Sequence, residues 1–248
     1  MIIISEISRV GEVAAAFPGA TRVFEAAGID YCCGGGRTLK DACVAVGAPL
    51  SGVLRALQNF EQARTGGESR DWRSADLSEL ITHIIDKHHV FTRLEMERLD
   101  KLLTKVCSVH GANHSELAGI ADLFRDLHAE LLSHMQKEEA VLFPYINDVQ
   151  QALHNMSPVS RPFFGTVRNP VRMMMQEHDH AGDILIRIRS LSADFKVPEG
   201  ACISYKTLYE ALAELERDLH QHIHLENNIL FPRATEMEEA AAAGSAAR

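Results

Sequence analysis

The sequence predicts an all-α protein, a four-helix bundle made of two helical hairpins and preceded by a small helical module. Hydrophobic residues make up 46% of the 248 residues but aromatic residues only 6%, and Ala, Leu, Glu and Met are common, as in helices. The segment HMQKEEAVLFP, which begins at His134, returns as HIHLENNILFP at His222. Long stretches also carry apolar residues at alternating three- and four-residue spacing, which is one face of a packed helix.

Residues 1–62 are expected to form the small helical module. A short helix is predicted over 21–27, and the turn IDYCCGGGR follows it. A second helix is predicted over 38–47, where a glycine ends it, and a third follows the candidate N-cap Ser51. Residues 63–75 are polar and contain glycine, so we expect a linker there.

The bundle is predicted over residues 76–240. Its four long helices are expected at about 76–109, 115–147, 171–193 and 204–237, from their apolar periodicity. Short loops join the first helix to the second and the third to the fourth, whereas a longer connection with three prolines joins the two halves. This order predicts two antiparallel hairpins.

The second and fourth helices carry matching core stripes. In the second helix the stripe reads Ile120, Phe124, Leu127, Leu131, His134, Glu138 and Val141. In the fourth helix it reads Leu208, Leu212, Leu215, Leu219, His222, Glu226 and Ile229. A His and a Glu thus interrupt each apolar seam one turn apart. Pro144 and Pro232 are expected to end or kink these helices, because proline removes a backbone donor.

Carboxylates on a core stripe indicate a metal site. An ionised Glu is costly to bury unless it is paired or coordinates a metal, and a His four residues away lies on the same helix face. A single core histidine is more often an ordinary hydrogen-bonded residue, but that interpretation must explain both copies and all four helices. Imidazole and carboxylate suit iron, manganese or zinc, and we expect two metals. The candidate ligands are His89, His134, Glu138, His178, His222 and Glu226.

The first bundle helix offers adjacent histidines, of which His89 is preferred as the ligand. Its apolar stripe reaches His89, and the repeat pairs His89 with His178. His88 is the alternative. Glu130 and Glu177 lie near the predicted ligands, and each is either a proton acceptor for a ligating histidine or a surface charge.

The five cysteines do not predict a disulfide framework, because their number is odd and two are adjacent. Cys32 and Cys33 lie in the glycine-rich turn, where free backbone amides are expected to lower the thiol pKa and favour thiolate. Redox chemistry, metal transfer and nitric-oxide chemistry are the functional interpretations of this pair. A buried structural pair is the alternative.

Charge and hydropathy exclude two classes of partner. A net charge of -9 gives binding to nucleic acid no electrostatic support. No apolar run approaches the roughly 20 residues that span a bilayer, and charges within the first ten residues argue against a signal peptide. We therefore expect no membrane partner, and the cysteine usage predicts a reducing cytoplasm.

Together these motifs resemble the Repair of Iron Centres family, which are hemerythrin-like di-iron proteins with an N-terminal cysteine domain of the ScdA type. The resemblance rests on DYCCGG, DWRSADLSELITHII, the repeated His-x-x-x-Glu with Leu-Phe-Pro, and Glu177-His178-Asp179. It covers nearly the whole chain and implies a hemerythrin-like up-down bundle. It also implies two iron ions per chain, oxo- and carboxylate-bridged, on the six candidate ligands, with the family's cysteines at Cys32 and Cys33.

The resemblance implies a cytoplasmic stress protein that repairs iron–sulfur clusters damaged by nitrosative or oxidative stress, by donating iron. Its partners would be damaged iron–sulfur proteins, with nitric oxide or dioxygen species as small ligands, and a homodimer is left open. The alternative is a nitric oxide scavenger or reductase at the same centre, so whether the chain is an enzyme is also left open. A hemerythrin-type oxygen carrier is less favoured, because such carriers use five histidines and these stripes offer four.

Overall fold

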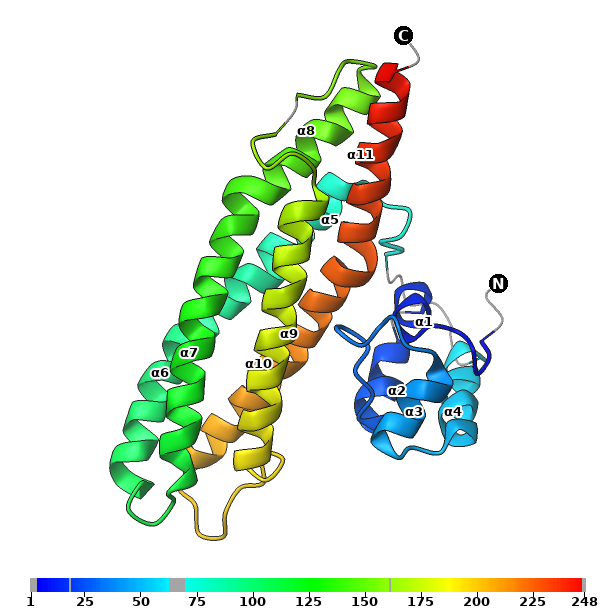
Figure 1. Cartoon of the computed structure of the whole chain (residues 1–248). Coiled ribbons are helices and arrows are strands. Elements are labelled where there is room, and N and C mark those ends of the chain that lie inside the picture. The colour runs from blue at the N-terminus through cyan, green and yellow to red at the C-terminus, as the bar shows by residue number, and fades with distance from the viewer. Residues whose placement is uncertain (1–3, 18, 63–69, 161, 247–248) are drawn as a thin grey trace. The chain divides into compact units, whose positions relative to one another are not determined.

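Helices make up the regular structure of the computed structural model, which describes residues 4–17, 19–62, 70–160 and 162–246 (Figure 1). Within these ranges there is no β-strand, only one isolated bridge between Arg9 and Thr38. The expected all-α class is therefore confirmed. No helix in the described part of the chain has the length and hydropathy needed to cross a membrane.

The chain divides into two compact units. The bundle unit comprises Thr82–Asp148 and Ser160–Leu219, and the cysteine unit comprises Met1–Ile81, Val149–Val159 and His220–Arg248. Three helices in the described part of the chain, α5 (Leu77–His83), α8 (Phe143–His154) and α10 (Ile203–Leu225), cross this division. The units therefore differ from the sequence domains predicted above. The boundaries of those domains remain predictions.

The bundle unit packs four helices around one apolar core. These helices are α6 (Val90–His110), α7 (Glu116–Lys137), α9 (Arg168–Leu191) and, as far as Leu219, α10 (Ile203–Leu225). The predicted stripes face inward, and one buried cluster draws on all four helices. Members of this cluster with almost no exposed surface include Leu99, Leu127, Ile188 and Leu208. The four-helix bundle expected from the apolar spacing is thus confirmed.

Three turns in the described part of the chain are π-helical, and each includes a predicted ligand. They are η1 (Ile84–His89), η2 (Glu138–Leu142) and η3 (Glu226–Leu230). In η2 and η3 the first carbonyl, that of Glu138 or Glu226, accepts a hydrogen bond from the amide five residues later. Such turns are rare and occur often at functional sites.

The break expected at Pro144 and Pro232 is present, but it falls just before each proline: α7 ends at Lys137 and α10 at Leu225. The chain passes from η2 into α8 (Phe143–His154) and from η3 into α11 (Phe231–Ala246), and each proline is the second residue of its new helix. A proline in the first turn lacks only an amide that the helix does not need there. The irregularity therefore falls in the π-helical turn before each proline.

Four short helices form most of the cysteine unit's N-terminal part: α1 (Val10–Ala16), α2 (Ala20–Ala27), α3 (Leu39–Val46) and α4 (Leu50–Gln62). Their apolar residues share one core that includes Phe24 and Leu39. Gly28 and Gly47 end α2 and α3 with left-handed φ values of 67° and 68°, as glycine caps do. Helix α5 (Leu77–His83) follows the predicted linker, of which residues 63–69 lie outside the described residues.

Candidate metal centre

Four of the six predicted ligands lie together in the bundle unit. His89 ends η1, His134 lies in the last turn of α7, Glu138 begins η2 and His178 lies in the middle of α9. Their exposed fractions are 0%, 2%, 0% and 1%. A carboxylate and three imidazoles therefore share a site from which solvent is excluded.

The ring nitrogens of these histidines converge on one carboxylate. The Nε2 atoms of His89 and His134 lie 3.4 and 3.3 Å from the same oxygen of Glu138. The Nε2 atom of His178 lies 3.0 Å from that of His134. One ligand atom from each of His134, Glu138 and His178 lies within 4.8 Å of the others, a grouping that could hold a metal ion.

Carboxylates on the far side of two imidazole rings orient these histidines. Glu139 accepts a hydrogen bond from Nδ1 of His89 at 2.6 Å, and Glu177 accepts one from Nδ1 of His134 at 2.8 Å. Because Nδ1 carries the proton in each ring, Nε2 is left to face the centre. Outer carboxylates of this kind fix the tautomer of metal-binding histidines and raise their basicity.

Hydrogen bonds keep both outer carboxylates ionised. The bond from His134, with an added contribution from Lys137, lowers the pKa of Glu177 to about 2 despite partial burial. Burial alone would raise the pKa of Glu139, but hydrogen bonds from Arg93 and His89 outweigh it and lower the pKa. Each outer carboxylate is thus charged near neutral pH and paired with a cation on its solvent side.

The remaining two predicted ligands, His222 and Glu226, form a pair in the cysteine unit. The Nε2 atom of His222 lies 3.0 Å from a carboxylate oxygen of Glu226. Both side chains are buried, and they repeat the one-turn spacing of His134 and Glu138. The structure therefore places the predicted ligands as a group of four in one unit and a pair in the other.

Neighbouring histidines take other roles. His88 is as buried as His89, but its Nδ1 lies 2.9 Å from Asp218, whereas His89 faces Glu138. His180 is exposed and lies near Glu130, 3.3 Å away, so Glu130 is a surface charge. Of the two glutamates considered above, Glu177 alone contacts a predicted ligand. Glu139 was not among the residues predicted from the sequence, although its place beside Glu138 was a usable signal.

The donor set fits a metal such as iron. All six side chains offer nitrogen or carboxylate oxygen, and imidazole with carboxylate is a common set for iron, manganese and zinc. Two ring nitrogens lie beside one buried carboxylate oxygen, and a third lies beside one of those nitrogens. A cation between these groups would stabilise the arrangement. The described His and Glu clusters can thus hold a metal, while the number of ions is a separate question.

The turn that carries Cys32 and Cys33 is organised by Asp30. One carboxylate oxygen of Asp30 accepts hydrogen bonds from the amides of Cys32 and Cys33, both at 3.0 Å, and the other accepts from Gly34 at 2.8 Å. Both thiols are free, with their sulfurs 3.9 Å apart. The backbone amides are therefore occupied by a carboxylate rather than available to a thiolate.

The expectation of a lowered thiol pKa is wrong for Cys32. The hydrogen bond to Cys33, burial and the negative charge of Asp30 all raise the pKa of Cys32 well above its ordinary value. Cys32 is 5% exposed, and its sulfur lies 3.2 Å from a carboxylate oxygen of Asp30. Cys32 is thus a protonated, protected thiol in this conformation.

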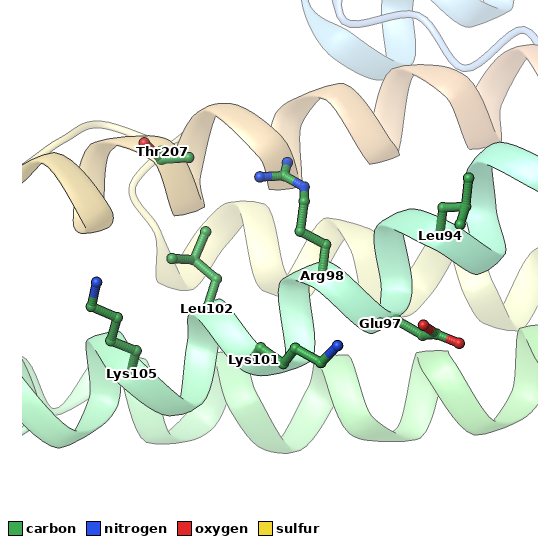
Figure 2. Close-up of a pocket in the computed structure, with 7 residues that line it drawn as sticks. All are labelled: Leu94, Glu97, Arg98, Lys101, Leu102, Lys105 and Thr207. Carbon is green, nitrogen blue, oxygen red and sulfur yellow. The ribbon is translucent and has the colours of Figure 1, made fainter.

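An open groove of about 420 Å³ lies along α6, and none of its lining residues is a predicted ligand (Figure 2). Its lining is mixed, with three cationic side chains among apolar ones, as Figure 2 shows. The lining residues are Leu94, Glu97, Arg98, Lys101, Leu102, Lys105 and Thr207. It contains no histidine or cysteine and offers no set of metal-binding side chains.

Comparison with known proteins gives two family matches. Residues 80–234 match the hemerythrin HHE cation-binding domain. Residues 6–61 match ScdA_N, a domain of unknown function.

Similar full-length proteins carry repair names. A probable iron–sulfur cluster repair protein of Haemophilus influenzae is 36% identical over 225 residues, which covers 91% of this chain and 95% of the relative. The iron–sulfur cluster repair protein YtfE of Edwardsiella ictaluri is 37% identical with the same coverage, and that of Escherichia coli O81 is 36% identical.

Proposed function

The chain belongs to the hemerythrin HHE cation-binding family, and we propose that it repairs damaged iron–sulfur clusters with iron held by the ligands described above. Its relatives named as iron–sulfur cluster repair proteins match it over nearly their whole length. Both the ScdA_N and the hemerythrin regions are present in the chain. Damaged iron–sulfur proteins are accordingly its partners.

The observation that carries this proposal is a buried group of ligands around Glu138. Nε2 atoms of His89 and His134 lie beside its carboxylate, and His178 lies against His134 within the same group. The second pair, His222 and Glu226, is proposed to complete a centre of two irons. One observation supports it: the pair repeats the His134–Glu138 motif in sequence and in burial.

Iron held at this site would be the ion that the protein supplies to an iron–sulfur cluster that has lost an iron. Delivery needs an exchange of ligands and no change in oxidation state, so labile imidazole and carboxylate ligands suit it. Glu139 and Glu177 hold the protons of His89 and His134 on Nδ1, which keeps each Nε2 atom available for the ion. Nitric oxide and dioxygen are the small ligands proposed for the same centre, the cytoplasm is the proposed location, and a homodimer is the proposed assembly.

Cys32 and Cys33 are proposed to receive iron during transfer, by an exchange of ligands. With Asp30 they offer three ligand atoms within 4.8 Å of one another. A thiol must lose its proton to bind a metal, and the raised pKa of Cys32 opposes this while the turn stays buried. The turn therefore has to change before the pair can act.

The test is repair of a damaged protein. Iron-loaded protein is incubated anaerobically with aconitase whose cluster has been damaged by nitric oxide, beside an equal amount of free ferrous iron. We expect recovery of aconitase activity beyond that given by free iron. His178→Ala should abolish the excess, whereas His180→Ala, which changes an exposed histidine of the same helix, should not. Recovery equal to that from free iron would rule the function out.

A further inference from the structure

The two copies of the ligand motif differ at the residues after the glutamate. In the first copy Glu138 is followed by Glu139 and Ala140, and in the second Glu226 is followed by Asn227 and Asn228. Glu139 serves the first copy as the partner of His89. The asparagines of the second copy have a different role from that of Glu139.

Asn228 contacts the backbone of the cysteine turn. Its side-chain amide nitrogen lies 3.1 Å from the carbonyl oxygen of Tyr31 and 3.2 Å from that of Cys32. Asn227 adds a longer contact to the Cys32 carbonyl, at 3.4 Å. The same Asn228 nitrogen lies 3.0 Å from Nδ1 of His224, one turn earlier in the chain.

Two glycines admit the Asn228 side chain. A Cβ atom added to Gly11 or to Gly35 would lie 2.3 or 2.5 Å from its side-chain oxygen, distances that atoms do not tolerate. Gly11 and Gly35 are themselves joined by a backbone hydrogen bond of 2.8 Å. A Cβ atom added to the adjacent Gly36 would meet nothing within 4 Å. The Asn228 side chain therefore fits only because Gly35 in the turn and Gly11 in α1 have no side chains.

We propose that Asn228 is a positioning residue that seats the turn from Asp30 to Gly35 against η3, the segment that begins with the predicted ligand Glu226. Seated in this way, the turn keeps the Cys32 thiol buried. Release of the turn from Asn228 is then the change that exposes the thiol pair. The significance of this for iron transfer rests on the function proposed above, but the seating itself does not.

The experiment measures the alkylation rate of each cysteine in the full chain by iodoacetamide and mass spectrometry. Asn228→Asp keeps the size of the side chain but removes both N–H donors. Gly35→Ala keeps Asn228 and fills its space, and Gly36→Ala is the matched control. Cys43, which is 1% exposed in the core shared by the N-terminal helices of the cysteine unit, reports whether this part of the unit stays folded.

We expect Cys32 to react about tenfold faster in Asn228→Asp and Gly35→Ala, as loss of one or two hydrogen bonds implies. Cys43 should stay slow in every variant, Gly36→Ala should match wild type, and iron content should not change. Unchanged reactivity of Cys32 in both variants would overturn the proposal. So would equal acceleration of Cys43 in both, because Asn228 would then support the whole module. Neither result depends on whether wild-type protein repairs clusters, so failure of the function is detected separately.

Discussion

The Nδ1 atom of His134 donates a 2.8 Å hydrogen bond to Glu177, the residue directly before His178 on the neighbouring helix. Two adjacent residues of α9 thus have related roles: His178 is a predicted ligand, and Glu177 orients the predicted ligand His134. The bond turns Nε2 of His134 towards Glu138 and His178. The centre is therefore built from helices that hold one another's ligands in place.

Removal of this anchor is expected to weaken the centre without deleting a ligand. Glu177→Gln should lower iron affinity about 10–100-fold, the usual cost of losing an outer carboxylate. Competition against a chelator of known affinity measures it. Glu130→Gln, which changes an exposed carboxylate near His180, is the control and should leave affinity unchanged. Equal affinities in the two variants would show that Glu177 does not orient His134.

Substitutions of the adjacent histidines His88 and His89 are expected to have different effects. His89→Ala should lose bound iron, because its Nε2 faces Glu138. His88→Ala should keep iron and instead lower stability, because it leaves the partly buried Asp218 without its hydrogen bond from His88. Metal analysis and thermal unfolding of both variants provide the measurements. Iron lost from His88→Ala and retained by His89→Ala would reverse the assignment.

Metal removal is expected to destabilise the protein through Glu138. At a metal concentration about 1,000 times the Kd, binding adds about 4 kcal/mol, which corresponds to roughly 10 °C in Tm for a chain of this size. A chelator should therefore lower the Tm of wild type by about that amount. In Glu138→Gln the shift should nearly vanish, because the variant lacks the shared carboxylate. An equal shift in both proteins would place the metal elsewhere.

The bundle core is expected to respond to loss of volume. Leu127→Ala removes a fully buried side chain from the shared cluster and should lower the free energy of unfolding by about 2–5 kcal/mol. Leu132→Ala, on the exposed side of the same helix, should change it by less than about 0.5 kcal/mol. Urea unfolding at equilibrium measures both. A small effect at Leu127 would contradict the packing of α7.

Much of the fold and of the ligand set could be predicted from the spacing of apolar residues in the sequence. The stripes through Leu127 and Leu215 predicted α7 and α10, because a 3.6-residue period with apolar positions has few other solutions. The same stripes place His134 and Glu138 on one buried face. Helix α1 was not predicted, because Gly11 in its first turn lowers helix propensity and tertiary packing compensates for it.

Other features depend on contacts that periodicity cannot report. The π-helical turns before Pro144 and Pro232 were not foreseen, since a proline signals a break without saying how the chain absorbs it. The thiol prediction failed because Asp30 takes the amides that Cys32 was expected to use. The role of Asn228 depends on contacts with a turn almost 200 residues earlier in the chain. The second copy of the motif differs in sequence from the first, but that difference does not show which segment Asn228 contacts.

Iron analysis of anaerobically purified protein, with a visible spectrum, is the decisive measurement for the metal centre. We expect two irons per chain in wild type and their joint loss in both His134→Ala and Glu226→Ala, since these ligands come from the two copies of one motif. A protein with no metal or with a single zinc ion would contradict the proposed di-iron centre. So would a variant that loses one iron and keeps the other in full.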